Sequence, residues 1–239
     1  MEVRINKYLA QNGLCSRRSA DTLIKSGKVI INDKKAKLGD KIDTTKDKIL
    51  VNNKLIKPQE DLVYYMLNKP VGYVSTTKDD HASRMITDLV PNNPRVFPVG
   101  RLDRQSEGLI ILTNDGEITN LLTHPKFEHE KEYKIEAVIT HGLKDLKAVK
   151  NRLNRFKIGM IIDGKNTLPT EAKNIEFFPP KLVKFDVTLK EGRKRQIRRM
   201  CELIGLDVRR LQRIRINKLR LEALKVGDFK KIAREDILG

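Results

Sequence analysis

One short segment combines a carboxylate, two arginines and an apolar run. GRLDRQSEGLIILTNDG, residues 100–116, places Asp103 between Arg101 and Arg104. A carboxylate that an arginine keeps ionised can act as a nucleophile or as a base. The alternative is a turn aspartate that only forms a structural ion pair with one of the arginines, since such pairs are common.

The apolar run that follows indicates how the carboxylate is positioned. Residues 109–112, Leu-Ile-Ile-Leu, are bounded by Gly108 and by an Asn-Asp-Gly turn. A short β-forming run with such boundaries is typical of a strand buried on both faces. Asp103 therefore lies on the loop that enters a core strand, where a rigid scaffold can hold a reactive group.

Length and charge limit the class of protein. The chain has 239 residues, which favours two domains. Its 49 Lys and Arg against 31 Asp and Glu give a net charge of +18, and such a field attracts a polyanion. Aromatic residues make up 5% of the chain and there is no Trp, so phosphate contacts and duplex shape are expected to contribute more than base stacking.

Cysteine and histidine usage indicates no metal site. Cys15 and Cys201 are far apart, and the four histidines, at 81, 124, 129 and 141, show no ligand spacing. We expect the histidines to be surface or capping residues. The N-terminus is polar and no apolar stretch is long enough to span a membrane, so we expect a cytoplasmic protein without a membrane partner.

The first 58 residues predict a small helix-helix-hairpin domain. Residues 4–26 have helical spacing interrupted by Gly13, and Ser16 can cap the second helix. Short strands are expected from residue 28, around Ile42 and at 49–51. We expect one domain over residues 1–58 and a second domain over residues 59–239.

Basic residues are concentrated on this first domain. Residues 1–59 hold 14 basic and 6 acidic side chains, a net charge of +8. Arg4 and Lys7 are expected on one face of the first helix, and Arg17 and Arg18 at the start of the second, where free N–H groups favour phosphate. We predict an RNA-binding face, the alternative being a solvated charged surface.

The second domain predicts an α+β fold with a mixed, mainly antiparallel sheet flanked by helices. Strands outnumber helices and are mostly joined by short turns, among them a type I′ turn at Asp163-Gly164. A helix is expected over 194–204, with a core face that contains Ile197, Met200, Cys201 and Ile204. Arg198 and Arg199 adjoin this face, so one of them can point inward, or the helix can simply face RNA.

Two known families resemble these segments. RINKYLAQNGLCSRRSADTLIKSGKVIIN resembles the small RNA-binding domain of ribosomal protein S4 and of several RNA-modifying enzymes. FPVGRLDRQSEGLIILTNDG, HEKEYKI and EGRKRQIRRMCELIG resemble, in order and spacing, the three core motifs of pseudouridine synthases of the ribosomal-RNA (RsuA) type, and LNKPVGYVST resembles their first strand. Ser106 stands where that family often has Thr, and it keeps the hydroxyl.

The resemblance implies roles for three residues. Asp103 matches the essential catalytic aspartate. Tyr133 matches the tyrosine that packs on uracil and assists removal of the proton from carbon 5. Arg198 matches the arginine that pairs with the aspartate. Arg101 and Arg104 would then contact phosphate or the loop.

The resemblance also implies a reaction and a substrate. The family isomerises uridine to pseudouridine without a cofactor, and we expect a monomer that acts on ribosomal RNA, foremost the large-subunit 23S rRNA. Small-subunit 16S rRNA or a tRNA are the alternative substrates. A non-catalytic RNA-binding or ribosome-assembly factor is the alternative class.

Overall fold

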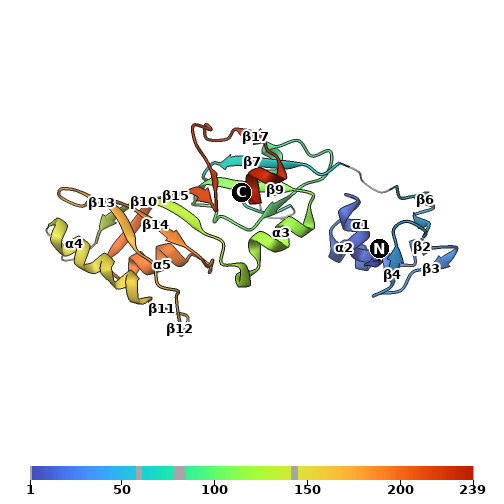
Figure 1. The fold of residues 1–239 in the computed structure, drawn as a ribbon, viewed down its shortest axis with the longest axis horizontal. Coiled ribbons are helices and arrows are strands. Elements are labelled where there is room, and N and C mark those ends of the chain that lie inside the picture. Colours follow the sequence, from blue (N-terminus) through green and yellow to red (C-terminus); the bar gives the residue numbers. More distant parts are fainter. Residues whose placement is uncertain (1, 58–60, 78–83, 141–144, 239) are drawn as a thin grey trace.

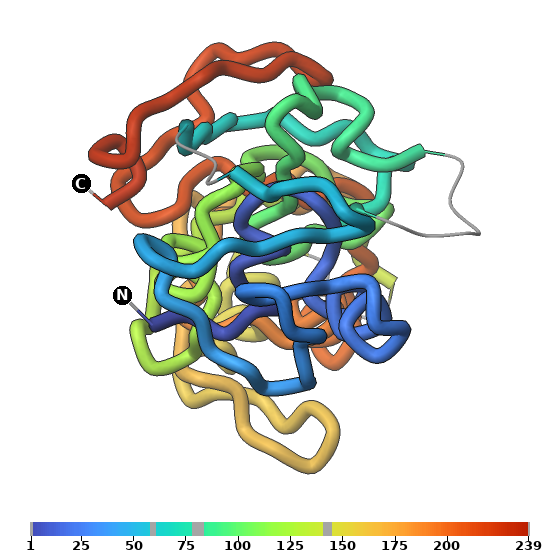
Figure 2. Tube along the Cα trace, turned by 90° about the vertical axis from the view of Figure 1, so that its right-hand side faces the viewer, coloured from blue at the N-terminus to red at the C-terminus, as the bar shows by residue number. Residues whose placement is uncertain are grey.

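The computed structural model describes residues 2–57, 61–77, 84–140 and 145–238. The molecule is elongated, with the N-terminal part at one end and the large sheet extending through the middle to the other end (Figure 1). Viewed along the long axis, the N-terminal strands and helices stand in front of the sheet domain (Figure 2). The predicted α+β class is confirmed, whereas the expected boundary at residues 58 and 59 lies outside the described residues.

The N-terminal domain contains two helices and short antiparallel strands around one core. One sheet has the order β3-β2-β5-β6, and β1 pairs with β4. Val3, Leu9, Ala20, Ile24 and Val29 belong to the buried core between the helices and these strands. The elements are β1 (Glu2–Arg4), α1 (Ile5–Gln11), α2 (Arg17–Lys25), β2 (Val29–Ile31), β3 (Lys34–Lys35), β4 (Lys41–Asp43), β5 (Ile49–Val51) and β6 (Lys54–Leu55).

The first helix begins one residue later than predicted. Arg4 is the last residue of β1, pairs with Lys41 of β4 and has an extended backbone at φ −63° and ψ 135°. The prediction that Arg4 and Lys7 share a helix face is therefore wrong, because strand pairing holds Arg4 outside the helix. The predicted cap is confirmed, since Ser16 Oγ accepts a hydrogen bond from Ser19 N at 3.1 Å.

The second domain is built on a mixed sheet that, over the described residues, has nine strands. Its main path is β13-β14-β10-β15-β9-β7-β17, and only the β9–β15 pair is parallel. The strands are β7 (Tyr64–Lys69), β8 (Phe97–Val99), β9 (Glu107–Thr113), β10 (Lys131–Ile139), β13 (Ala172–Phe178), β14 (Leu182–Leu189), β15 (Leu206–Ile216), β16 (Leu219–Arg220) and β17 (Phe229–Lys231), with a separate hairpin β11 (Ile161–Ile162) and β12 (Lys165–Asn166). The predicted antiparallel character is confirmed.

Helices cover the sheet. The α-helices are α3 (Gly116–Thr123), α4 (Leu146–Leu153), α5 (Gln196–Glu202) and α6 (Arg234–Leu238), and the 3-10 helices are η1 (Ile86–Leu89), η2 (Pro125–Phe127) and η3 (Asn154–Ile158). Helices α4 and α5 share one core with β10, β14 and β15, and α3 and α6 share another with β7 and β9. The turn predicted at Asp163-Gly164 has positive φ at both residues, as a type I′ turn requires.

Strand β9 is buried on both faces, as its sequence predicts. Leu109, Ile110, Ile111 and Leu112 are all 0% exposed. Leu109 and Ile111 face the core that contains α3, while Ile110 and Leu112 face the core that contains Ile86 of η1. The loop that precedes this strand therefore leads directly into a fully buried strand of the core.

The basic segment 190–220 forms both a helix and a long strand. The predicted core face of α5 is confirmed, because Ile197, Met200, Cys201 and Ile204 are buried. The helix is shorter than predicted, since Arg195 has φ +54° and cannot be part of it. Strand β15 follows, and its pairing with β10 on one side and β9 on the other makes it central to the sheet.

Candidate active site

A buried lysine fixes the loop that carries Asp103. Lys69 at the end of β7 is 0% exposed, and its Nζ donates hydrogen bonds to the carbonyl oxygens of Pro70 (3.0 Å), Asp103 (3.2 Å) and Ser106 (2.7 Å). Ser75 adds two hydrogen bonds to the main chain of Leu102, at 2.9 and 3.1 Å. The main chain on both sides of the Asp103 carboxylate is thus held from behind by β7 and the turn after it.

The environment of Lys69 lowers its pKa to about 8. Burial is the main cause, and the positive charge of Arg213 acts in the same direction. The carboxylates of Asp103 and Glu107 oppose the shift. The two acids therefore help this ammonium group to remain charged in the interior.

Asp103 faces an open cavity of about 840 Å³ at the centre of the sheet domain. Tyr133 of β10 lines the same cavity and is half-buried, packed at the border of two hydrophobic cores. Lys131 and Arg213 also line it, from β10 and β15. Two of the three predicted chemical residues, Asp103 and Tyr133, are thus brought together by elements 30 residues apart in the chain.

Arg198 occupies a different position from the one predicted. Its Nη2 donates to the carbonyl oxygen of Gln105 and its Nη1 to that of Val208, both at 2.8 Å. It is not among the residues that line the cavity, and it forms no ion pair with Asp103, although both residues lie in the described part of the chain. Burial and the neighbouring Arg195 lower the pKa of Arg198, and Asp103 opposes this shift. Arg198 therefore holds the loop just after Asp103.

The two arginines beside Asp103 in sequence do not neutralise it. Both are exposed, and Arg104 Nε donates to the carbonyl oxygen of Gly72 at 3.2 Å. Among the described residues neither forms an ion pair with Asp103. The alternative, in which Asp103 is a turn residue that forms a structural ion pair with Arg101 or Arg104, is therefore not what the structure shows.

Strand β9 approaches β15 very closely beside Arg213. Gly108, with φ +102°, lies opposite Arg213 in the parallel pair. A Cβ at Gly108 would collide with the carbonyl oxygen of Arg213 and lie 2.7 Å from its nitrogen. The close approach lets Arg213 Nε donate to the carbonyl oxygen of Leu109 at 2.7 Å.

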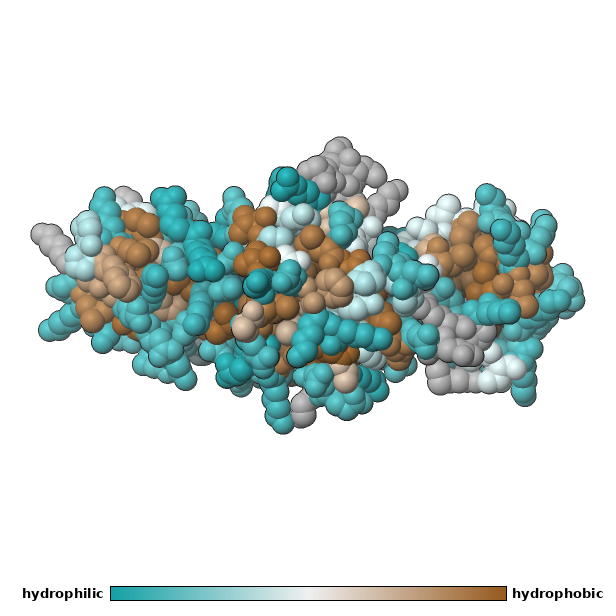
Figure 3. Space-filling view, turned by 90° about the horizontal axis from the view of Figure 1, so that it is seen from above, coloured by the Kyte–Doolittle hydropathy of each residue, from teal (hydrophilic) through white to brown (hydrophobic). Residues whose placement is uncertain are grey.

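The predicted RNA-binding residues lie on the surface of the N-terminal domain. Arg4, Arg17 and Arg18 are exposed, Lys7 is half-buried, and no ion pair involves them within the described segments. Seen from above, hydrophilic side chains surround separate hydrophobic patches along the whole elongated molecule (Figure 3). These four cations are therefore free to meet an anion.

Sequence reasoning did not single out Lys69, Lys131 and Arg213. Lys69 ends an apolar strand, and all six residues of this strand, β7, are buried. Arg213 lies in an Arg-rich segment, where alternation with Leu211 would have indicated an inward side chain. The β9–β15 pairing that buries it joins residues about 100 apart in the chain.

The histidines of the described segments have capping or bridging contacts. His124 Nδ1 accepts from Lys126 N at 3.3 Å, as a capping residue, and His129 contacts Leu121 O and Asn217 Nδ2 at 2.9 and 2.7 Å. His81 and His141 lie outside the described residues. Where the structure describes the chain, no three His, Cys, Asp or Glu side chains form a group that could hold a metal ion, and no helix is both long and apolar enough to cross a membrane.

Comparison with known proteins gives the family. A model of the RNA pseudouridylate synthase family matches residues 63–203, and a model of the S4 domain matches residues 3–49. A solved structure described as a crystal structure of pseudouridylate synthase aligns with a TM-score of 0.66 at 27% identity, over 99% of this chain and 98% of that one.

Two curated relatives cover nearly the whole chain. The dual-specificity RNA pseudouridine synthase RluF of Escherichia coli (strain K12) is 39% identical over 238 residues, which are 99% of this chain and 77% of the relative. The ribosomal large subunit pseudouridine synthase B of Bacillus subtilis (strain 168) is 37% identical over 239 residues, which are 98% of this chain and 93% of the relative. The chain belongs to the RNA pseudouridine synthases, which are isomerases.

Proposed function

We propose that this pseudouridine synthase isomerises a uridine of large-subunit 23S ribosomal RNA. The observation that carries the proposal is the cavity shared by Asp103 and Tyr133, in a domain preceded by a basic S4 domain. The name of the Bacillus subtilis relative supports the large subunit. The dual specificity in the name of the Escherichia coli relative keeps a second RNA, such as a tRNA or 16S rRNA, as an alternative substrate.

The reaction needs a carboxylate and a base-binding surface, and it needs no net oxidation. The bond from ribose carbon 1′ to uracil N1 breaks, the detached uracil turns, carbon 5 bonds to carbon 1′, the carbon-5 proton is lost and N1 gains a proton. Asp103 is the catalytic carboxylate in this proposal, acting as nucleophile or base. Tyr133 packs on the uracil, retains it while it turns and assists removal of the carbon-5 proton.

Arg198 acts as a positioning residue in this proposal. Its hydrogen bonds to the carbonyl oxygens of Gln105 and Val208 connect the loop beyond Asp103 to strand β15, and the attraction of Asp103 acts on the pKa of Arg198.

The two domains divide the work. We assign docking on structured RNA to residues 1–58 and chemistry to residues 59–239. Because the target atoms of uridine are hidden in a base stack, the nucleotide must be splayed out while the flanking helix is held. Exposed Arg17 and Arg18 at the start of α2 support phosphate contacts. The protein is proposed to act as a monomer in the cytoplasm.

Mapping of pseudouridine tests the substrate. Ribosomal RNA and tRNA from cells with and without this gene are compared position by position, and the purified protein is then added to RNA from cells that lack the gene. We expect one uridine in 23S rRNA to lose its modification in the deletion and to regain it in vitro. A missing pseudouridine confined to 16S rRNA or tRNA would contradict the large-subunit assignment.

A further inference from the structure

Two cations that line the cavity have no acidic partner among the residues that the structure describes. Lys131 and Arg213 line the cavity together with Asp103, and neither forms an ion pair in the described structure. Arg213 is only 3% exposed, and its Nη2 is buried without a hydrogen-bond partner. Lys131 Nζ donates to the carbonyl oxygen of His129 at 3.0 Å, and an ammonium group has three N–H donors, so this bond does not use them all.

A β-bulge directs Arg213 into the cavity. In the pairing of β10 with β15, Glu132 lies opposite Arg215 and Tyr133 lies opposite Arg213, so Ile214 is an extra residue. Residues two apart on a regular strand share a face, but the bulge places Arg213 on the Tyr133 side and Arg215 on the Glu132 side. Bulges beside functional sites commonly re-aim a side chain in this way.

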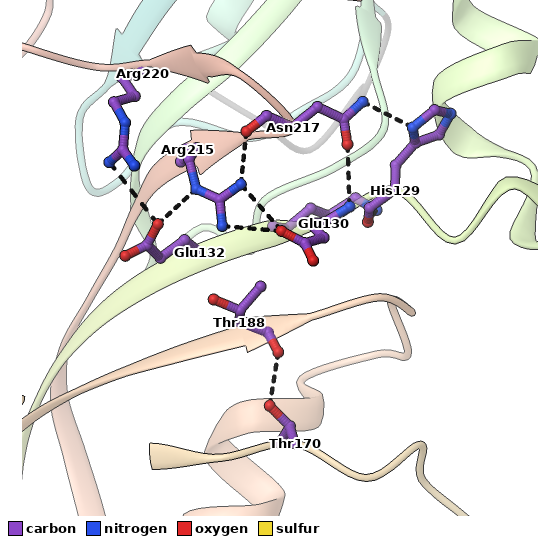
Figure 4. Close-up of polar contacts among 9 residues, drawn as sticks. His129, Glu130, Glu132, Thr170, Thr188, Arg215, Asn217 and Arg220 are labelled. Carbon is purple, nitrogen blue, oxygen red and sulfur yellow. Dashed lines mark hydrogen bonds and ion pairs between the residues drawn. The ribbon is translucent and has the colours of Figure 1, made fainter. Parts of the chain in front are cut away.

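Glu130 and Glu132, which flank Lys131 in sequence, are engaged on the opposite face of the sheet, whereas Glu128 and Glu191 line the cavity with Asp103, and Glu191 pairs with Arg193. Arg215 Nε donates to Glu132 at 2.6 Å, and its Nη1 and Nη2 reach Glu130 at 3.2 and 3.1 Å. Asn217 links this group to His129, and Arg220 approaches Glu132 (Figure 4). Glu130 and Glu132 are absent from the cavity lining, so they do not neutralise Lys131, which lies between them in sequence.

We propose that Arg213 and Lys131 form a phosphate-binding subsite for a phosphodiester adjacent to the target uridine. A buried guanidinium with a free N–H requires an acceptor, and its planar fork fits two phosphate oxygens. The subsite would hold the ribose-phosphate backbone while the uracil turns between Asp103 and Tyr133. The proposal rests on the proposed function, because the anion belongs to the substrate RNA.

The test is a binding cycle between the protein and single phosphates. Substrate stem-loops are synthesised with a neutral methylphosphonate 5′ of the target uridine, 3′ of it, or in the flanking duplex. All affinities are measured with proteins that carry Asp103→Asn, so that the RNA stays unmodified. The parent is the Asp103→Asn protein, and each of three variants adds one further change, which is Arg213→Met, Lys131→Met or Arg209→Met. Arg209 is an exposed residue of the same strand that pairs with Asp207. Circular dichroism and thermal melting establish that each variant is folded.

Coupling is the expected result. One of the two adjacent methylphosphonates should weaken binding about tenfold in the parent and leave the affinity of the Arg213→Met protein almost unchanged. The duplex methylphosphonate and Arg209→Met should show no coupling. If Arg213→Met does not fold, the same loss of coupling to the methylphosphonate is measured with Lys131→Met.

The subsite would be overturned if each adjacent methylphosphonate reduced the RNA affinity of the parent and of the folded variants by the same factor. This outcome is independent of turnover. The proposed function fails separately, if the wild-type protein does not form pseudouridine in the same unmodified stem-loop.

Discussion

Gly108 and Arg213 touch main chain to main chain in the parallel pair of β9 and β15, and Arg213 lines the same cavity as Asp103. No other residue type fits at position 108, because a Cβ there would collide with the Arg213 backbone and φ is +102°. This contact joins the half of the sheet that carries Asp103 to the half that carries Tyr133. The geometry of the site therefore depends on one glycine.

Replacing that glycine should destabilise the protein and separate the two halves of the site. We expect Gly108→Ala to lower the free energy of unfolding by at least about 2 kcal/mol, from overpacking and a strained backbone. Denaturant unfolding measures the loss. Gly116→Ala is the matched control, because a Cβ there meets nothing within 4 Å. Wild-type stability of Gly108→Ala would show that β15 can move aside.

Asp103→Asn tests the catalytic carboxylate. The change preserves shape and removes only charge, so RNA affinity should stay within a few-fold while pseudouridine formation becomes undetectable. A structural ion pair at the surface would cost about 1 kcal/mol or less and leave turnover intact. Tritium release from carbon-5-labelled uridine measures the rate. Asp207→Asn, which removes a surface carboxylate paired with Arg209, is the control. Turnover near wild type in Asp103→Asn refutes the proposed site.

Charge reversal at the start of α2 tests the docking role. Arg17→Glu with Arg18→Glu should weaken RNA binding and reduce the slope of log affinity against log salt by about 2, one for each lost phosphate contact. Turnover at saturating RNA should change much less. Lys147→Glu with Lys150→Glu on α4 gives the same change in net charge at exposed positions elsewhere. Equal effects of the two pairs would indicate a general field and no docking face.

Lys69 should give the folded protein a characteristic pH dependence. Its folded-state pKa of about 8 lies below the ordinary value of 10.5, so between these pH values the unfolded chain binds the additional proton. The contribution of Lys69 to stability should therefore rise as pH increases from about 8 to 10.5. Unfolding free energies of the wild type and Lys69→Met, measured across this window, should diverge in favour of the wild type.

The same variant links the lysine to the catalytic loop. Lys69→Met leaves three carbonyl oxygens around Asp103 without their donor, so kcat should fall more than RNA affinity. Lys134→Met, at an exposed position of β10, is the control. For the stability measurement, a parallel pH dependence of the unfolding free energy in the wild type and in Lys69→Met would contradict the desolvation of Lys69 that the structure indicates.

Isomerisation should proceed without a metal ion or a nucleotide. The reaction has no net redox change, and the chain contains no Gly-x-x-x-x-Gly-Lys-Ser/Thr segment. We expect the carbon-5 hydrogen to be released at an unchanged rate in the presence of EDTA. Magnesium affects RNA folding, so the RNA is refolded and its structure checked under each condition. Restoration of activity only by a metal ion or ATP would contradict the mechanism.

Local sequence determined much of this protein. The run at 109–112 is a strand buried on both faces, Ser16 caps α2, and the core face of α5 follows from its helical spacing. These features depend on residues close in the chain, where propensity and periodicity act. The motif around Asp103 likewise placed the candidate carboxylate on the loop before a core strand.

Long-range pairing decided the rest. The register of β10 against β15 turns Arg213 toward the cavity and Arg215 away from it, and no local pattern encodes this bulge. Arg4 belongs to a strand because β4 pairs with it, against its helical context. Arg198 contacts the carbonyl of Gln105, 93 residues earlier, and does not contact the Asp103 carboxylate. Such contacts join segments that only the folded sheet brings together, because their free energy depends on packing between elements distant in sequence.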